Sequence, residues 1–250
     1  PPPPPPPPPT RRQRPMPLRA RASAAQRPPR LGRGVVAAVA GPGLAERFSS
    51  AGATTISAAV GRLASTEEIL TAIMSTNRAE AVVLPNHRER VPAAVAAAHE
   101  AGDRGVHVAV IPTRTQVQGV AALAVHQVEH TFDTDVVAMT TAAAHCRDGA
   151  VTVAATHGVT TAGVCEPGDV LGIVGGDFVE IGSDHLDVAR AVLDRMLGVG
   201  GELVTVIEGA GAPSELTSAL VVWLEDEHPD LDVVVYQGGQ TRYSLLLGVE

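Results

Sequence analysis

Two polar loops carry the side chains best suited to bind a ligand. One follows an apolar run at residues 81–84, and the other follows a second apolar run at 106–111. In open parallel sheets, ligands bind beyond the carboxyl ends of the strands. The candidate binding residues in these loops are Asn86, His87, Thr113, Arg114, Gln118 and Gly119. An equally good interpretation is that both loops only cap the helices that follow them.

Glycines between a strand and a helix can hold a phosphate, and Gly41-Pro42-Gly43 has that position. Its spacing is not that of GxGxxG, because residue 46 is Glu, and the pattern GxxxxGK[ST] does not occur in the chain. An ordinary tight turn is therefore the preferred interpretation.

Histidines and cysteines predict no metal site. His126 and His130 are the one pair at helical spacing, but His-Gln-Val-Glu-His lacks the Glu that follows the first His of HExxH. We expect both to be exposed in a loop or at a helix end. Cys146 and Cys165 have no CxxC partner, and the neighbours His145 and Cys146 would point to different faces of a helix.

Paired carboxylates predict no catalytic set either. They occur at Asp133/Asp135, at Glu67/Glu68 and at 225–227, each at a helix start or on an amphipathic flank, where solvated charge is the default interpretation. The nucleophile pattern GxSxG is absent. We therefore assign no catalytic residue, no metal ligand and no cofactor to this chain.

Charge is unevenly distributed along the 250 residues. Residues 1–33 hold eight of the 19 arginines and no acidic residue, whereas the rest holds 11 arginines against 27 Asp and Glu. Nucleic acid and anionic membranes bind clustered positive charge, so an acidic body disfavours both. Two cysteines are too few for a disulfide framework, no apolar run reaches the roughly 18 residues that span a bilayer, and the first residues lack the order of a signal peptide. A cytoplasmic protein in a reducing compartment is expected.

The pattern of elements predicts an α/β fold. Residues 1–33 begin with nine prolines and predict a disordered or polyproline segment, for which an SH3-type ligand or a basic arm is the less favoured use. From residue 34, strands alternate with helices, which implies a parallel sheet. Short strands between 151 and 181 predict a small antiparallel unit. We expect two α/β lobes, 34–150 and 151–250, with mainly parallel sheet plus a central antiparallel hairpin region.

Helix starts are marked by local signals. Ser65-Thr66-Glu67-Glu68 has the spacing of a capping box, in which the Ser and the last Glu satisfy each other's backbone N–H groups. Strands are expected at 35–40, 54–57, 81–84 and 106–111, and helices at 44–50, 91–100, 116–125 and 135–147.

Several short motifs recur in a fixed order between residues 34 and 250. They are Gly41-Pro42-Gly43-Leu44, Ser65-Thr66-Glu67-Glu68-Ile69-Leu70, Val83-Leu84-Pro85-Asn86, Ile111-Pro112-Thr113, Gln118-Gly119, Gly168-Asp169 and Gly238-Gly239-Gln240. In this order they resemble the carboxy-terminal domain of the fatty acid kinase A-subunit family, which is related to the L subunit of dihydroxyacetone kinase.

The resemblance implies a three-part protein. Its amino-terminal domain binds ATP and magnesium, a middle domain follows, and the carboxy-terminal domain helps to engage a DegV-like carrier that presents a fatty acid. The product is acyl phosphate for phospholipid synthesis. The Asp-rich, metal-holding motif of the kinase domain is not found in this chain, so a separately encoded kinase domain is an expected partner and the chain alone should not transfer phosphate. The resemblance adds Gly239 and Gln240 to the candidate binding residues.

One loop departs from the family pattern. Where the family usually has Gly-Gly-Gln-Thr-x-Asn-Pro-Ser, residues 58–65 place Val60, Gly61 and Leu63 at positions of amide and hydroxyl groups. A ligand site that used this loop is therefore in doubt. The leading hypothesis is a non-catalytic interaction domain of a fatty-acid-kinase-like protein. Its rivals are a stand-alone phosphate-binding or acyl-binding protein or enzyme that uses the two polar loops, and a truncated remnant without activity.

Overall fold

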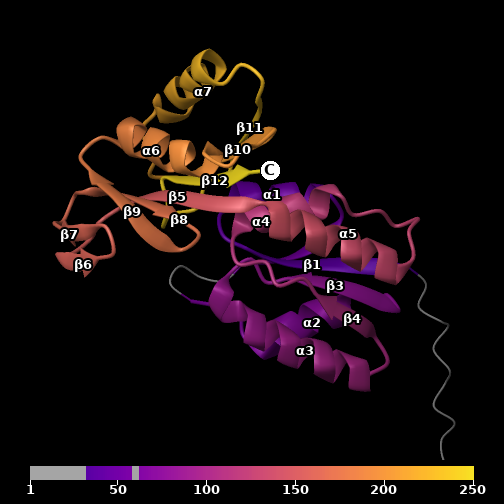
Figure 1. The fold of residues 1–250 in the computed structure, drawn as a ribbon. Coiled ribbons are helices and arrows are strands. Elements are labelled where there is room, and N and C mark those ends of the chain that lie inside the picture. The colour runs from indigo at the N-terminus through magenta and orange to yellow at the C-terminus, as the bar shows by residue number, and fades with distance from the viewer. Residues whose placement is uncertain (1–31, 58–61) are drawn as a thin grey trace, which may run out of the picture.

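The computed structural model describes residues 32–57 and 62–250. The proline-rich segment up to residue 31 lies outside the described residues, and so do residues 58–61 of the altered loop. Within the described ranges the chain forms two large sheets and three groups of helices (Figure 1). None of these helices is both long enough and apolar enough to cross a membrane.

The first sheet is entirely parallel. Its strands lie in the order β2-β1-β3-β4. Their bounds are β1 (Arg33–Val39), β2 (Ala53–Ser57), β3 (Glu80–Leu84) and β4 (His107–Val110). The connections contain α1 (Pro42–Ser50), α2 (Thr66–Ser75), the short helix η1 (Arg88–Arg90) and α3 (Val91–Asp103). The alternation of strands and helices and the parallel pairing predicted for this region are confirmed.

The sequence of β1 explains its central place. It is apolar on both faces, as buried parallel strands usually are. Val35, Ala37 and Val39 pack on one side of the sheet, and Val36 packs on the other. After β2, α2 begins at the predicted capping box, which is confirmed. The N–H of Glu68 donates to Ser65 Oγ over 3.3 Å, and the N–H of Ser65 donates to the Glu68 carboxylate over 2.8 Å.

The second sheet is mixed and mostly antiparallel. Its order is β11-β10-β12-β5-β8-β9, in which only β10 and β11 pair in parallel. The bounds are β5 (Arg147–Val153), β8 (Val170–Val174), β9 (Asp177–Gly182), β10 (Leu203–Glu208), β11 (Asp232–Gln237) and β12 (Leu245–Val249). A separate hairpin joins β6 (Gly158–Thr160) to β7 (Gly163–Cys165). The helices α6 (His185–Leu197) and α7 (Leu216–Glu227) pack on one face of this sheet.

This sheet departs from the expected pattern in two ways. The strands between 151 and 181 do not form a unit of their own, because β5, β8 and β9 belong to the six-stranded sheet and only β6 and β7 stand apart. Parallel pairing also predominates only in the first sheet. The cause is β12, which runs antiparallel between β10 and β5 and places Leu245 opposite Val151. The periodicity of apolar residues within a strand does not show which distant strand it pairs with, so the sequence could not predict this pairing.

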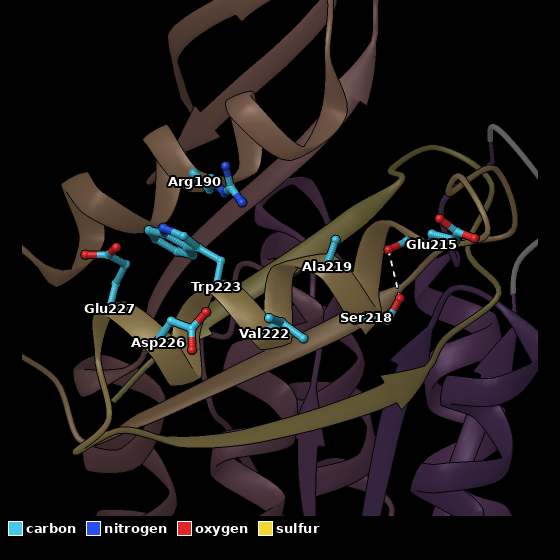
Figure 2. A pocket seen from close by; sticks show the side chains of 8 residues that line it. All are labelled: Arg190, Glu215, Ser218, Ala219, Val222, Trp223, Asp226 and Glu227. Carbon is cyan, nitrogen blue, oxygen red and sulfur yellow. Dashed lines mark hydrogen bonds between the residues drawn. The ribbon is translucent and has the colours of Figure 1, made fainter.

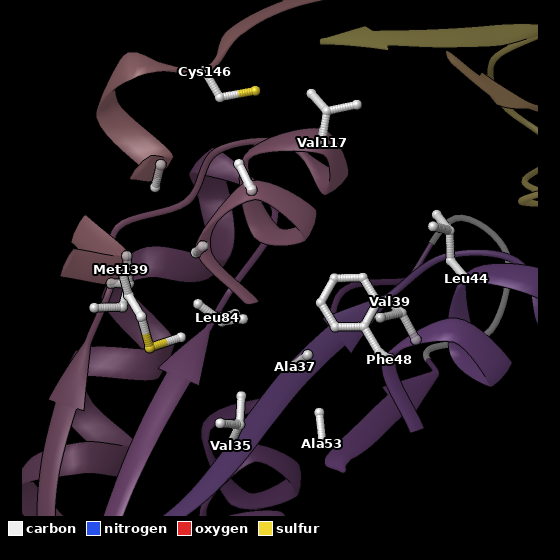
Figure 3. Close-up of a cluster of buried hydrophobic side chains, with 14 of the residues drawn as sticks. Val35, Ala37, Val39, Leu44, Phe48, Ala53, Leu84, Val117, Met139 and Cys146 are labelled. Atoms are coloured by element: carbon white, nitrogen blue, oxygen red, sulfur yellow. The ribbon is translucent and has the colours of Figure 1, made fainter. Parts of the chain in front are cut away.

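Helices between the two sheets give the domain a shared core. They are α1, α4 (Gln116–Ala124) and α5 (Phe132–His145) (Figure 1). One cluster of buried side chains joins Val39 of β1, Phe48 of α1, Met139 of α5 and Leu246 of β12, and Figure 3 shows the part of it that surrounds β1. The helices α2 and α3 cover the other face of the first sheet, and α6 and α7 cover the other face of the second. The result is five layers that alternate between helices and sheets.

A buried ion pair, which we call the Arg33 clamp, joins β1 to the first turn of α5. Arg33 Nη1 lies 2.6 Å from Asp135 Oδ2, and both side chains are almost completely buried. His126 Nδ1 lies 2.7 Å from the same oxygen, and the N–H of Gln127 donates to the other one over 2.9 Å. Arg33 also donates to the carbonyl of His130 over 3.0 Å.

The Arg33 clamp corrects three expectations. Arg33 is the first residue of β1, not the last residue of a disordered segment. Asp135 is buried, although Asp133, its neighbour in the pair predicted to be solvated, is exposed. The side chain of His126 is only 11% exposed, whereas His130 is exposed as expected. A carboxylate at the start of a helix is usually exposed to solvent. The sequence alone does not show that β1 packs over Asp135.

Removing the cation of the Arg33 clamp should destabilise the protein strongly. Arg33→Met removes the guanidinium from the buried Asp135 carboxylate and leaves it with His126 and the N–H of Gln127, and breaking a buried pair on one side costs about 3–5 kcal/mol. Arg104→Met breaks the exposed Arg104–Glu100 pair and should change the free energy of unfolding by less than about 1 kcal/mol. Urea unfolding of both variants measures the difference. If both variants lost a small and equal amount of unfolding free energy, a structural role for the Arg33 clamp would be contradicted.

Acid should weaken the same clamp. Burial alone would raise the pKa of Asp135, but hydrogen bonds from Gln127, His126 and Arg33 outweigh burial and hold the pKa below its usual value. Such a carboxyl stabilises the fold fully above its unfolded pKa, and this contribution is lost as pH falls through the folded pKa. Below about pH 4, the free energy of unfolding should therefore fall more steeply for the wild type than for Asp135→Asn. Urea unfolding across this pH range tests it, and parallel curves would speak against the assignment.

Candidate functional site

Three loops meet at the carboxyl end of the first sheet, after β1, β3 and β4. Their common point is the carbonyl of Ala38, to which Asn86 Nδ2 donates over 3.1 Å and Gln116 Nε2 over 3.5 Å. Thr113 Oγ1 accepts the N–H of Asn86 over 3.0 Å. Asn86, Thr113 and Gln116 are all buried. The predicted Asn86 and Thr113 are thus brought together, but as buried supports of the loops.

Asn86 and Gly119 form a packing pair inside this junction. Asn86 has a φ of +52°, a left-handed conformation that Asn adopts more readily than most residues. A Cβ at position 119 would collide with the Asn86 side chain, so only glycine lets α4 approach the loop this closely. Among the described residues, Asn86 Oδ1 accepts no hydrogen bond. Gly119 therefore contributes to the junction by having no side chain, which leaves room for the side chain of Asn86.

Gln118 connects the junction to the second sheet. Its Oε1 accepts the N–H of Arg114 over 2.8 Å, and its Nε2 donates to the carbonyl of Cys146 over 3.3 Å and to Asp148 Oδ1 over 3.4 Å. Burial, with the nearby carboxylates of Glu250 and Asp148, raises the pKa of the Cys146 thiol to about 12. A buried thiol that stays protonated at neutral pH is no nucleophile.

The motif Gly41-Pro42-Gly43, which follows β1 of the first sheet, contacts the motif Gly238-Gly239-Gln240, which follows β11 of the second sheet. The N–H groups of Gly43 and Leu44 donate to the carbonyl of Gly238 over 3.0 and 3.3 Å. A Cβ on Gly43 would collide with the carbonyl of Gln237, so the close approach requires glycine. The donors that a phosphate would need at the start of α1 are already used here. The preferred interpretation of Gly41-Pro42-Gly43 as a turn agrees with this geometry.

Gln240 and His87 have mainly local partners. Gln240 is 2% exposed, and its Nε2 donates to the carbonyl of Ile207 over 3.1 Å. Gly239, with a φ of +70°, lies against Pro42. His87 caps η1, because its Nδ1 accepts the N–H of Glu89 over 3.2 Å. Gln240 and Gly239 therefore support the turn between the sheets, and His87 supports a helix start.

Exposed arginines surround the junction, and we call Arg88, Arg114 and Arg242 the arginine rim. Burial raises the pKa of Asp148, while the charges of Arg114 and Arg88 act in the opposite direction. Burial and the nearby charges of Arg90 and Arg242 lower the pKa of His87. These interactions place cations from loops of both sheets around one group of buried polar residues.

The arginine rim has the chemical groups that an anion-binding surface needs. A guanidinium matches a carboxylate or phosphate with two parallel hydrogen bonds. In the described ranges no group of three or more His, Cys, Asp or Glu side chains has the arrangement of a metal site. The sequence interpretation missed Gln116, Arg88 and Arg242. Gln116 was visible as a polar residue in the second loop, but the arginines have no shared motif and meet only in the fold.

Two helical glycines allow a matched test of the junction. Gly119→Ala should destabilise by about 1–3 kcal/mol, because the added methyl group forces Asn86 out of its place. Gly102→Ala in α3 should be neutral or stabilising by up to about 1 kcal/mol, because nothing lies within 4 Å of its Cβ and alanine favours helix. Thermal and urea unfolding distinguish the two. Equal effects would contradict the packing role of Gly119.

Comparisons with known proteins agree with this architecture. Residues 34–250 match the FakA-like C-terminal family, which is described as the C-terminal domain of proteins like the A subunit of fatty acid kinase. Uncharacterized proteins of Staphylococcus aureus strains USA300 and NCTC 8325 are 30% identical over 211 residues, which cover 84% of this chain and 38% of theirs. The chain therefore spans well under half the length of these curated relatives.

Solved structures share the fold at low sequence identity. The dihydroxyacetone kinase of C. freundii in complex with AMP-PNP and Mg²⁺ superposes with a TM-score of 0.66 at 15% identity, over 87% of this chain and 48% of that one. A DegV lipid-binding protein of Thermotoga maritima gives 0.66 at 9% identity, over 88% and 98%. A fatty-acid-binding DegV family protein of Thermus thermophilus gives 0.61 at 11% identity, over 88% and 100%. Because the family match extends from the second residue of β1 to the last residue, this chain belongs to the family of carboxy-terminal domains like that of the fatty acid kinase A subunit.

Proposed function

We propose that this domain engages a DegV-like fatty-acid carrier, so that a separate ATP-binding domain can make acyl phosphate for phospholipid synthesis. The observation that carries the proposal is the family match over residues 34–250. It assigns the chain to the carboxy-terminal part of a kinase subunit. In this role the ATP and Mg²⁺ belong to another domain, and this domain contributes binding and positioning in the cytoplasm.

The arginine rim gives this role a contact surface. Arg88, Arg114 and Arg242 are exposed on a body in which acidic residues far outnumber basic ones. A fatty-acid carrier presents a carboxylate, and the product is the mixed anhydride of that group with phosphate, so both states are anionic. Cations beside the contact would hold that group while the other domain transfers the phosphate.

Replacing the rim should weaken the carrier complex. The full chain is titrated by calorimetry with an oleate-loaded DegV family protein from the same genome. Arg88→Ala/Arg114→Ala should weaken binding about tenfold or more, because the anionic group of the carrier loses two exposed guanidinium partners. The control Arg104→Ala/Arg195→Ala removes two cations elsewhere and should leave the affinity unchanged. No association with or without the kinase domain, or an equal loss in both double variants, would contradict the proposal.

A second candidate is direct binding of a phosphate or acyl anion by this domain. It is favoured by the meeting of cations from two sheets at one junction, and by the lipid and fatty acid binding of the DegV family proteins named above. Here the arginine rim would hold the ligand itself and would not depend on a carrier.

Direct binding should appear as thermal stabilisation. A ligand that binds only the folded state adds about 2.7 kcal/mol at 100 times its Kd, so the melting temperature should rise with the concentration of phosphate, acetyl phosphate or oleate. Arg88→Ala/Arg114→Ala should abolish the rise, and Arg104→Ala/Arg195→Ala should keep it. Melting temperatures that stay constant for all three ligands would exclude this candidate.

A further inference from the structure

The helix α7 has an apolar side that the second sheet does not cover. Leu216, Leu220 and Leu224 are buried against the sheet, as one stripe of an amphipathic helix requires. The next stripe carries Val222, which is 55% exposed, and Trp223, which is half-buried and packs with part of its ring against the same core. Trp223 is the one tryptophan of the chain. Tryptophan at a surface is typical of binding sites more than of solvated helix faces.

A groove of about 430 Å³ runs along this stripe, beside α6. Figure 2 shows Trp223 between the two helices, with Arg190 of α6 on one side and Val222 beyond it. The guanidinium carbon of Arg190 lies 5.7 Å from the centre of the indole ring, and His228 meets the ring edge-on. Arg190, Trp223, Val222 and Ala219 all line this shallow, open groove.

Three carboxylates stand at the two ends of the groove. Glu215 lies at its start, and Asp226 and Glu227 lie at its end. None of the three forms an ion pair with a described arginine or histidine. The last turn of α7 has no basic residue, so Asp226 and Glu227 also face the negative end of their own helix. This arrangement is locally unfavourable, and a cation from outside would relieve it.

We propose that this groove docks a basic segment of a partner protein. Its apolar side chain lies against Val222 and Trp223, and an Arg or Lys on either side faces Glu215 at one end and Asp226 at the other. Asp226 comes eleven positions after the N-cap residue Glu215, which is about three helical turns, so the two basic side chains stand about 16 Å apart. The body of a second copy, residues 34–250, fits poorly because it holds 27 acidic residues against 11 arginines.

The groove lies on the face of the second sheet that points away from the first sheet, whereas the arginine rim lies at the loops where the two sheets meet. α7 packs on the face that carries Val204, Val206 and Leu247, whereas Ile207 and Leu246 face the helices between the sheets. In Figure 1, α7 lies at the top of the molecule, away from the first sheet. An occupant of the groove therefore leaves the rim free for a carrier. The two sites recognise opposite charges, so they take different partners.

Tryptophan fluorescence gives a direct test. Because Trp223 is the one tryptophan, emission of the full chain reports on the groove alone. The probe is a 12-residue alanine-based peptide with arginine at both ends and leucine on the face between them, positions that share one side of a helix. We expect a saturable blue shift whose apparent Kd rises with ionic strength. A peptide with glutamate in place of arginine should cause none.

A matched pair of double variants tests the charges. Asp226→Asn/Glu227→Gln should weaken probe binding about tenfold, without loss of thermal stability, since it removes like charge from a negative helix end. Glu46→Gln/Glu129→Gln changes the net charge equally at exposed sites elsewhere and should leave probe binding unchanged.

Four outcomes would overturn the docking proposal. The first is that the probe causes no change in emission, whether the groove is empty or is filled by the chain's own arginine-rich residues 11–30. The second is that the glutamate peptide binds with equal affinity, and the third is that both double variants lose the same amount of probe affinity. The fourth is that emission changes with protein concentration alone, which would assign the groove to a second copy.

Discussion

A layer of helices that is apolar on two opposite sides holds this domain together. α1, α4 and α5 pack against the first sheet through residues such as Val39 and against the second through Leu246, within one continuous cluster. Protein interiors are close-packed, so this layer transmits any change in volume to both sheets. Phe48 and Met139, which are almost completely buried in it, therefore determine the spacing of the sheets as well as the position of their own helices.

The position of the junction follows from this layer. Because the sheets share helices, the loops after β1, β3 and β4 end beside the segments that lead into β5 and β12. There the start of α1 bonds to Gly238, and Gln118 reaches Asp148. The buried amides hold the loops in place, and the arginines stand outside them. This division of roles agrees with the proposed contact between the arginine rim and an anionic group.

Charge separates the two recognition surfaces. The arginine rim concentrates cations at the junction of an acidic body, while the groove beside α7 concentrates carboxylates around Val222 and Trp223. Surface charges more than a Debye length apart, about 8 Å at physiological ionic strength, act almost independently. The second sheet separates α7 from the helices of the middle layer, so the two proposed surfaces do not overlap.

The sequence by itself determined the features that depend on neighbours along the chain. The capping box at Ser65, the parallel strands joined by helices, the turn at Gly41 and the family were all predictable, because each rests on local periodicity, local capping or motifs in order. The tertiary structure alone decided the rest. β12 inserts antiparallel beside β5, Arg33 meets Asp135, Gly119 makes room for Asn86, and Arg242 approaches His87. In each case the partners lie far apart in the sequence, and only packing of the whole chain determines whether a charge is buried and which group satisfies it.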